Sequence, residues 1–118
     1  MAKIRYVGNE IKKMKIIVTG LNHKKAPIQI REKLAFSNAQ VTAALAELKN
    51  RFSESEFVLL STCNRVEMYC ATKRNGGVTP HDLAKFLSDF HNIKTGDFED
   101  YLYVHNDIDA VRHLLTVA

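Results

Sequence analysis

Two strand-like runs, residues 57–61 and 66–72, lie four residues apart and constrain the fold more than any other feature of the chain. Both runs are rich in β-branched, aromatic and aliphatic residues. Four residues are enough for a hairpin turn but not for an intervening helix. The two strands are therefore expected to pair antiparallel, and the fold has to accommodate this hairpin.

The segments on either side of the hairpin alternate between strand and helix patterns. Strand segments are short and β-branched, whereas helical segments repeat apolar residues at spacings of three and four. Ser37 or Asn38 is expected to cap one helix, and Thr79 with Pro80 to begin another. The predicted elements are strand 15–21, a short helix 28–35, helix 39–50, strands 57–61 and 66–72, helix 80–91, strand 101–105, and a last helix capped by Asn106 or Asp107.

The order strand, helix, strand, strand, helix, strand is the split βαβ pattern of a ferredoxin-like sandwich. The sequence therefore predicts an α+β fold with an antiparallel sheet, helices on one face and an extra C-terminal helix. In such a sheet the first and third strands are central. The second and fourth strands lie at opposite edges.

Length and composition are those of one ordinary globular domain, with 118 residues of which 46% are apolar and 25% charged. The longest apolar runs fall far short of the ~20 residues that span a bilayer. Residues 1–13 lack the apolar segment of a signal peptide. These features predict a cytoplasmic protein without membrane association.

Positive charge is concentrated at the start of the chain. Residues 1–13 hold four basic side chains and one acidic side chain, and the whole chain carries a net charge of +4. We interpret residues 1–14 as a basic N-terminal extension and residues 15–118 as the folded domain. The basic run is either a solvated leader or a contribution to binding a polyanion such as RNA.

Cys63 occupies the turn of the predicted hairpin, between Thr62 and Asn64 and two residues before Arg65. A free cysteine is often only a small buried apolar residue, but these polar neighbours are a poor setting for packing. Backbone N–H groups of a tight turn and the Arg65 guanidinium would both favour the thiolate. The pattern indicates a nucleophile for attack on an acyl carbon.

The other titratable candidates are less specific. Cys70 lies within strand 66–72, where core packing is the better interpretation, and the chain has neither a CxxC pair nor any other metal-ligand spacing. Neither a disulfide framework nor a metal site is expected. Topology alone does not select an acid or base from the histidines. A surface position is expected for His81 and His91, and a structural role for His113.

Three sequence blocks carry a resemblance to a known family. They are LNHKKAP with REKLAFS at 21–27 and 31–37, LSTCNRVEMY at 60–69, and YVH with DAVRHL at 103–105 and 109–114. In this order they resemble the N-terminal catalytic domain of glutamyl-tRNA reductase, whose middle block reads STCNRxE[LMIV]Y. Residues 1–14 fall outside the resemblance.

The resemblance implies a chemistry that agrees with the properties of the turn. This oxidoreductase family uses NADPH to reduce the glutamyl group of glutamyl-tRNA to glutamate-1-semialdehyde, the first step of five-carbon tetrapyrrole (5-aminolevulinate, haem) biosynthesis. Its nucleophile matches Cys63, whose thiolate forms a thioester that accepts hydride. Residues matching Thr62, Cys63, Asn64 and Arg65 bind the glutamate, and the match of His105 is important for activity as an acid/base or polarising group.

The family also has parts with no counterpart in these residues. Its NADPH-binding and dimerisation domains are absent, no GxGxxG occurs, and no residue of the chain is assigned to cofactor binding. The chain alone is not expected to be a complete reductase. The full-length protein is expected to be a homodimer with glutamate-1-semialdehyde aminomutase acting downstream. An alternative class is a ferredoxin-like RNA-binding module without catalysis.

Overall fold

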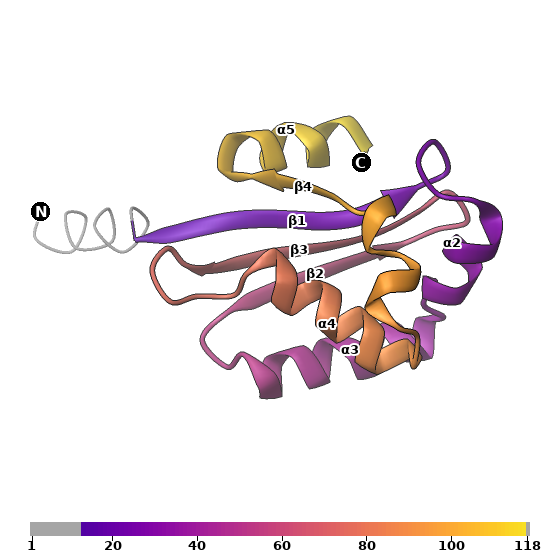
Figure 1. The fold of residues 1–118 in the computed structure, drawn as a ribbon. Helices are drawn as coiled ribbons and strands as arrows, with labels where there is room; N and C mark the ends of the chain where they lie inside the picture. Colours follow the sequence, from indigo (N-terminus) through magenta and orange to yellow (C-terminus); the bar gives the residue numbers. More distant parts are fainter. Residues whose placement is uncertain (1–12, 118) are drawn as a thin grey trace, which may run out of the picture.

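The computed structural model describes residues 13–117 and contains every helix and strand expected from the sequence (Figure 1). The elements are β1 (Met14–Asn22), α2 (Ile28–Leu34), α3 (Asn38–Arg51), β2 (Glu56–Ser61), β3 (Arg65–Lys73), α4 (Pro80–His91), the 3₁₀ turns η1 (Thr95–Asp97) and η2 (Glu99–Tyr101), β4 (Tyr103–Asn106) and α5 (Asp107–Val117). The predicted extension, residues 1–14, lies outside the described residues except for its last two positions.

The four strands form one antiparallel sheet in the order β2-β3-β1-β4. The central pair runs from Met14 opposite Lys73 to Asn22 opposite Arg65. The edge strand β4 is shorter than expected, because residues 99–101 form a 3₁₀ turn instead of continuing the strand. The strand order and directions confirm the predicted ferredoxin-like α+β arrangement.

Helices α3 and α4 cover one face of the sheet and enclose the main core with it (Figure 1). Both helices start at reciprocal capping boxes, in which Ser37 pairs with Gln40 and Thr79 pairs with Asp82. Leu48 of α3 and Phe86 of α4 are fully buried in this core. No helix within residues 13–117 is both long enough and apolar enough to cross a membrane.

Helix α5 lies over the opposite face of the sheet, above β1 and β4 (Figure 1). Its buried Ala110 packs with Val18 of β1 and Tyr69 of β3. Helix α5 starts at Asp107, directly after Asn106, the other residue expected to cap it, and the Asp107 carboxylate bonds to other elements. That carboxylate accepts a hydrogen bond from the Ile16 N–H at 3.0 Å and pairs with Arg74 at 3.1 Å. The helix is thereby fastened to the end of the sheet remote from the hairpin turn.

Candidate active site

The predicted nucleophile, Cys63, is exposed in the tight turn between β2 and β3. Thr62 closes this turn. Its backbone N–H donates to the Arg65 carbonyl at 2.8 Å, and its hydroxyl oxygen accepts from the N–H groups of Asn64 and Arg65, both at 3.2 Å. The four residues expected to form the site, Thr62 to Arg65, are therefore held together by the turn itself.

Two neighbouring segments hold the same turn from outside. The Arg31 guanidinium donates to the Cys63 carbonyl at 2.7 Å and to the Ala26 carbonyl at 3.2 Å. The His23 N–H donates to the Asn64 carbonyl at 2.8 Å. Charge-assisted bonds such as those of Arg31 are roughly twice as strong as neutral ones. Cys63 is thus presented on a turn fixed by three chain segments, although sequence reasoning gave Arg31 no role.

The sequence led us to expect that the backbone N–H groups of the turn favour a thiolate. In the structure these groups differ in whether they are free to do so. The N–H groups of Asn64 and Arg65 are already bonded to the Thr62 hydroxyl. Within residues 13–117 the Cys63 N–H has no hydrogen-bond acceptor. It remains as the backbone donor that could stabilise an oxyanion formed next to the thiol.

Arg65 lies at the start of β3 with its side chain only 20% exposed. Its Nη1 atom is 3.6 Å from Oε2 of Glu67, a distance for an ion pair but not for a hydrogen bond. The same Nη1 atom is buried and has no hydrogen-bond partner within the described residues. The guanidinium is therefore oriented from one side by a carboxylate, and its exposed part remains available to a ligand.

Glu67 is the centre of a polar cluster that sequence reasoning missed. Its side chain is fully buried, and it accepts hydrogen bonds from the hydroxyls of Tyr69 at 2.9 Å and Tyr103 at 2.5 Å. His113 Nε2 contacts the same carboxylate and forms an ion pair with it when protonated. Burial, and then the hydrogen bonds to Glu67, raise the pKa of both tyrosines, so they stay protonated donors.

Gly20 makes this cluster possible. In the sheet register it lies between Glu67 on β3 and Tyr103 on β4. A Cβ atom at position 20 would lie 2.3 Å from the Val66 carbonyl oxygen and 2.9 Å from the Glu67 Cα. Because both atoms belong to the backbone, they cannot move aside easily. The absence of a side chain lets the carboxylate and the phenol meet across β1.

The sequence left open whether His105 reaches the turn, and the sheet register places it at a distance from the turn. His105 pairs with Val18 on β1. Arg65 pairs with Asn22, which lies four residues further along the same strand. At about 3.3 Å per residue this places the His105 backbone roughly 13 Å along the sheet from Arg65. Within the described residues no hydrogen bond or ring contact joins His105 to residues 62–65.

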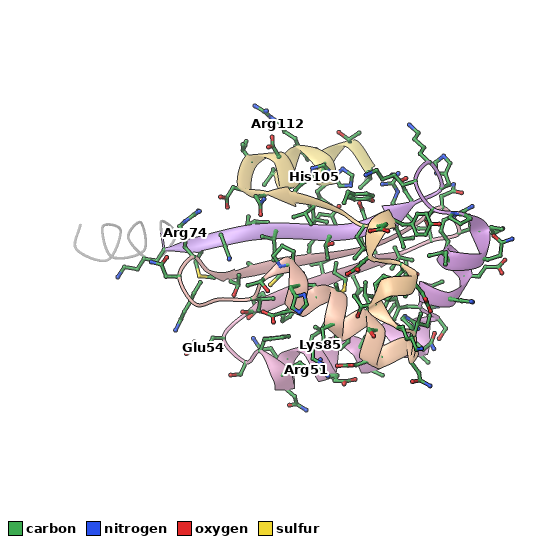
Figure 2. The ribbon with its side chains drawn as sticks, in the orientation of Figure 1. Arg51, Glu54, Arg74, Lys85, His105 and Arg112 are labelled. Carbon is green, nitrogen blue, oxygen red and sulfur yellow. The ribbon has the colours of Figure 1, made fainter. Side chains whose placement is uncertain are left out.

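The surroundings of His105 are aromatic. Figure 2 shows it between β4 and α5, and its ring centroid lies 4.6 Å from that of His113 and 5.5 Å from that of Tyr103. Both neighbours contact Glu67. His105 is therefore linked to the Arg65 side of the site through these two residues. The structural role expected for His113 is confirmed, and its partner is a buried carboxylate.

Two further residues test the sequence interpretation. Cys70 is 1% exposed in the core under α3 and α4, which confirms core packing, and burial raises the pKa of its thiol to about 12. The expectation that His91 lies at the surface is wrong. The centroid of its ring lies 4.4 Å from that of Phe36 and 5.2 Å from that of Phe90. Burial lowers the pKa of His91.

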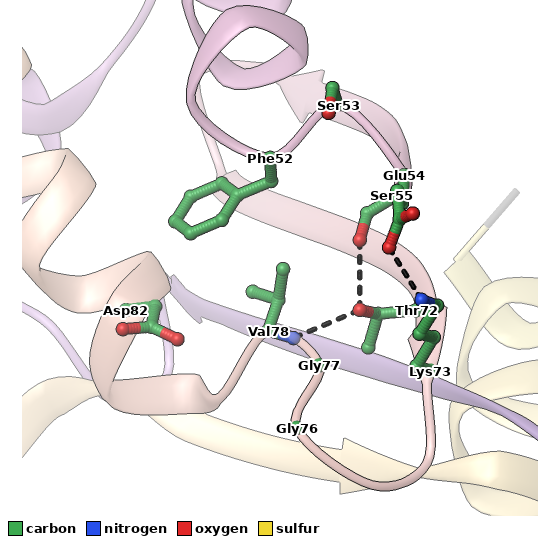
Figure 3. Close-up of a pocket in the computed structure, with 10 residues that line it drawn as sticks. All are labelled: Phe52, Ser53, Glu54, Ser55, Thr72, Lys73, Gly76, Gly77, Val78 and Asp82. Atoms are coloured by element: carbon green, nitrogen blue, oxygen red, sulfur yellow. Dashed lines mark hydrogen bonds and ion pairs between the residues drawn. The ribbon is translucent and has the colours of Figure 1, made fainter.

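A hollow of about 300 Å³ lies at the other end of the sheet, between the α3–β2 and β3–α4 connections (Figure 3). Its main polar groups bond to one another, since the Thr72 hydroxyl contacts that of Ser55 at 2.8 Å and accepts from the Val78 N–H at 2.9 Å. Glu54 and Lys73 pair at its rim. Because these groups are already paired, the hollow is a weaker site candidate than the Cys63 turn.

Comparison with known proteins identifies the class to which this fold and site belong. Residues 19–118 match the family described as "Glutamyl-tRNAGlu reductase, N-terminal domain". The chain belongs to this family. The sequence resemblance is thereby confirmed over most of the chain.

Individual relatives carry the name of the whole enzyme. Glutamyl-tRNA reductase of Thermodesulfovibrio yellowstonii is 50% identical over 112 residues, and that of Pseudoalteromonas translucida is 41% identical over 105 residues. Each comparison covers 89% of this chain, but 26% and 24% of the respective relatives. The solved glutamyl-tRNA reductase from Methanopyrus kandleri is 31% identical with a TM-score of 0.54, over 84% of this chain and 21% of that one. The chain thus spans about a quarter of the length of these relatives.

Proposed function

We propose that this domain carries out the acyl-transfer step of a glutamyl-tRNA reductase, with Cys63 as nucleophile and glutamyl-tRNA as substrate. The observation that supports this most directly is an exposed thiol on a turn fixed by Arg31, His23 and Thr62. A rigid turn favours reaction because the sulfur is held in place without further ordering when substrate arrives. Packing alone does not require a cysteine at such a position.

The proposed step exchanges an ester for a thioester. The Cys63 thiolate attacks the carbonyl carbon of the glutamyl ester, and a carbon–sulfur bond forms as the carbonyl oxygen becomes an oxyanion. The Cys63 N–H is the free backbone donor next to that oxygen. Collapse of the intermediate breaks the bond to the ribose oxygen, which takes up a proton as the tRNA leaves. The product is a glutamyl thioester on Cys63.

Arg65 is proposed to bind the side-chain carboxylate of the glutamyl group. A planar guanidinium matches a carboxylate through two parallel hydrogen bonds. Glu67 sits behind Arg65 at 3.6 Å and orients it from the buried side. Thr62 and Asn64 flank the thiol and complete the proposed pocket. The arrangement selects an acidic side chain, because a neutral amide would leave the guanidinium charge uncompensated.

His105 is proposed to act as an acid/base or polarising group at a distance from the thiol. Its ring contacts His113, which in turn contacts Glu67 behind Arg65. Through these contacts His105 is proposed to act on the charge of the buried Glu67 cluster. Direct proton transfer at Cys63 is not part of the proposal, since the register separates the two residues along the sheet.

The described residues do not fit an NADPH site. Dinucleotides bind where a glycine-rich turn leads into a free helix N-terminus. Here the Gly76-Gly77 connection leads to α4, in whose first turn the Asp82 N–H donates to the Thr79 hydroxyl and the Asp82 carboxylate adds negative charge. Reduction of the thioester to glutamate-1-semialdehyde is therefore assigned to the whole reductase and not to residues of this domain.

An RNA-binding module without catalysis is less well supported. Such modules stack bases on exposed aromatic rings of the sheet. Tyr69 is 7% exposed beneath α5, and α3 and α4 cover the other face. The sheet therefore offers no aromatic platform over its central strands within the described residues.

The proposed function is tested by intact mass spectrometry of the chain after incubation with glutamyl-tRNA in the absence of NADPH. We expect a single glutamyl adduct that maps to Cys63 and is released by a neutral thiol or hydroxylamine. Cys63→Ala should abolish the adduct, whereas Cys70→Ala should retain it. An adduct that persists in the Cys63→Ala chain would refute the assignment of the nucleophile.

Substitution Arg65→Lys should impair acylation while leaving the fold intact. An ammonium group on a flexible stem cannot reproduce two parallel hydrogen bonds to a carboxylate. We expect a loss on the order of 1.5–3 kcal/mol in transition-state stabilisation, the usual range for hydrogen bonds to charged groups. The acylation rate should fall accordingly, and discrimination against a glutaminyl ester should weaken.

The measurement compares acylation rates with glutamyl and glutaminyl donors for both proteins, in the full-length reductase as well as in this domain. Circular dichroism checks that the Lys variant keeps its unfolding temperature. Unchanged rates together with unchanged glutamate selectivity would show that Arg65 serves only the structure of the turn.

A further inference from the structure

The connection between β1 and α2, residues 23–27, carries two adjacent exposed lysines, Lys24 and Lys25, and is called the basic loop below. Helix α2 continues the positive charge with Arg31 and Lys33. Residues 22–34 hold four basic side chains and one acidic side chain. This is a local excess of positive charge directly after the first central strand.

Among residues 13–117 no ion pair neutralises the charge of the basic loop. Elsewhere, seven Lys or Arg side chains pair with carboxylates on their own or neighbouring elements: Lys49, Arg51, Arg65, Lys73, Arg74, Lys85 and Arg112. Figure 2 labels Arg51, Arg74, Lys85 and Arg112. Within residues 13–117 no carboxylate lies within ion-pair distance of Lys24 or Lys25. Lys24 and Lys25 therefore carry positive charge beside the Cys63 turn that no carboxylate of the described residues compensates through an ion pair.

The basic loop is rigid and is joined to the Cys63 turn. The Asn22 side-chain oxygen accepts from the N–H groups of Lys24 and Lys25 at 3.0 and 3.2 Å, which fixes the loop backbone. Ala26 is buried at its end, and the Arg31 guanidinium bridges the carbonyls of Ala26 and Cys63. The same residue that positions the nucleophile therefore also positions the two lysines.

We propose that Lys24 and Lys25 form the surface that receives the phosphates at the acceptor end of the RNA substrate. The inference rests on the proposed function, because an ester at the thiol brings the terminal nucleotides of the RNA next to this turn. Each lysine supplies a compact ammonium charge for a phosphate oxygen. The backbone N–H groups of the loop are already bonded, so the contact is made by side chains.

Binding of this kind has a defined signature. Phosphate contacts by lysine carry no base specificity. Their affinity falls as the salt concentration rises, because binding releases counterions from the RNA and this release is less favourable at high salt. Removal of one such lysine reduces the slope of log K against log salt by about 1. Two lysines acting together should therefore account for a slope change of about 2.

The test measures the affinity of the chain for deacylated tRNA, which carries no amino acid, by fluorescence anisotropy at several salt concentrations. The variant Lys24→Gln/Lys25→Gln is compared with Lys49→Gln/Lys85→Gln, which removes the same charge from ion-paired positions on α3 and α4. We expect weaker binding and a salt slope lower by about 2 in the first variant only. Equal affinities and slopes in the two variants would overturn the proposal.

A second measurement separates this proposal from the proposed function. Acylation of Cys63 is followed with glutamyl-tRNA and with a small glutamyl thioester that contains no phosphate. The basic-loop variant should be slower with glutamyl-tRNA at subsaturating concentration and unchanged with the small donor. Equal slowing with both donors would overturn the phosphate surface, whereas failure of the unmodified chain to acylate with either donor would refute the proposed function alone.

Discussion

Cys63 will be alkylated by iodoacetamide on the order of a thousandfold faster than Cys70 in the folded protein at pH 7.5. The reacting species is the thiolate. Burial raises the pKa of Cys70 to about 12, so only about one in thirty thousand of its side chains is ionised at that pH. The Cys70 sulfur is also shielded in the core, whereas Cys63 is exposed.

The rates are measured by quenching at intervals and mapping the two cysteine peptides. Unfolding in guanidinium chloride is the internal control, because it should bring the two rates together. A Cys63→Ser chain should show only the slow reaction. Similar rates in the folded protein would mean that the hairpin turn protects its thiol, and the case for a nucleophile would fail.

Substitution Glu67→Ala should destabilise the domain by roughly 3–5 kcal/mol, the range found when one partner of a buried ion pair is removed. The loss has two sources. Arg65 would lose the carboxylate that compensates its charge, and His113 and the hydroxyls of Tyr69 and Tyr103 would lose their hydrogen-bond partner. With roughly 4–8 °C per kcal/mol for a domain of this size, the unfolding temperature should fall by more than about 12 °C.

Chemical and thermal unfolding followed by circular dichroism measure this loss. Glu56→Ala is the matched control, since Glu56 pairs with Lys49 at 2.9 Å but its side chain is 78% exposed, and such pairs contribute about 0–1 kcal/mol. Glu67→Gln keeps an acceptor oxygen without the charge and should fall between the two. Equal stabilities of the Glu67→Ala and Glu56→Ala chains would show that the cluster does not support the fold.

Most of the fold was predictable because its signals are local. The hairpin followed from the shortness of residues 62–65, and the helix starts followed from Ser37 and from Thr79 with Pro80. Once the order of segments is known, few sheet topologies remain. The bounds of β4 were less accurate, because a 3₁₀ turn and a strand start are not distinguished by apolar content.

The site was predictable only as far as it is contiguous in sequence. Residues Thr62 to Arg65 are neighbours in the chain, and their chemistry could be interpreted directly. The Glu67 cluster is assembled from β3, β4 and α5, so no short window contains it. One signal was available, since Arg65, Glu67 and Tyr69 alternate along β3 and must share a face.

The alternation along β3 also limits where the chain can be lengthened. Met68 and Cys70 point into the core under α3 and α4, whereas Glu67 and Tyr69 point toward α5. Shifting a strand by one residue exchanges its two faces. If a residue inserted in the Cys63 turn shifted β3 by one position, the Glu67 carboxylate would face the apolar core and Met68 would face the polar cluster. The hydrogen bonds of Thr62 across the turn leave little slack to absorb it.

The connection that follows β3, at the other end of the strand, can be lengthened without shifting the strand register. Gly76 has a φ of 75° and nothing within 4 Å of its missing side chain. Peptide tags, spacer segments or fluorescent labels should therefore be placed at Gly76 and kept away from the Cys63 turn. A graft at Gly76 would lengthen the loop in open space and leave the strand register, and with it both faces of the sheet, as they are.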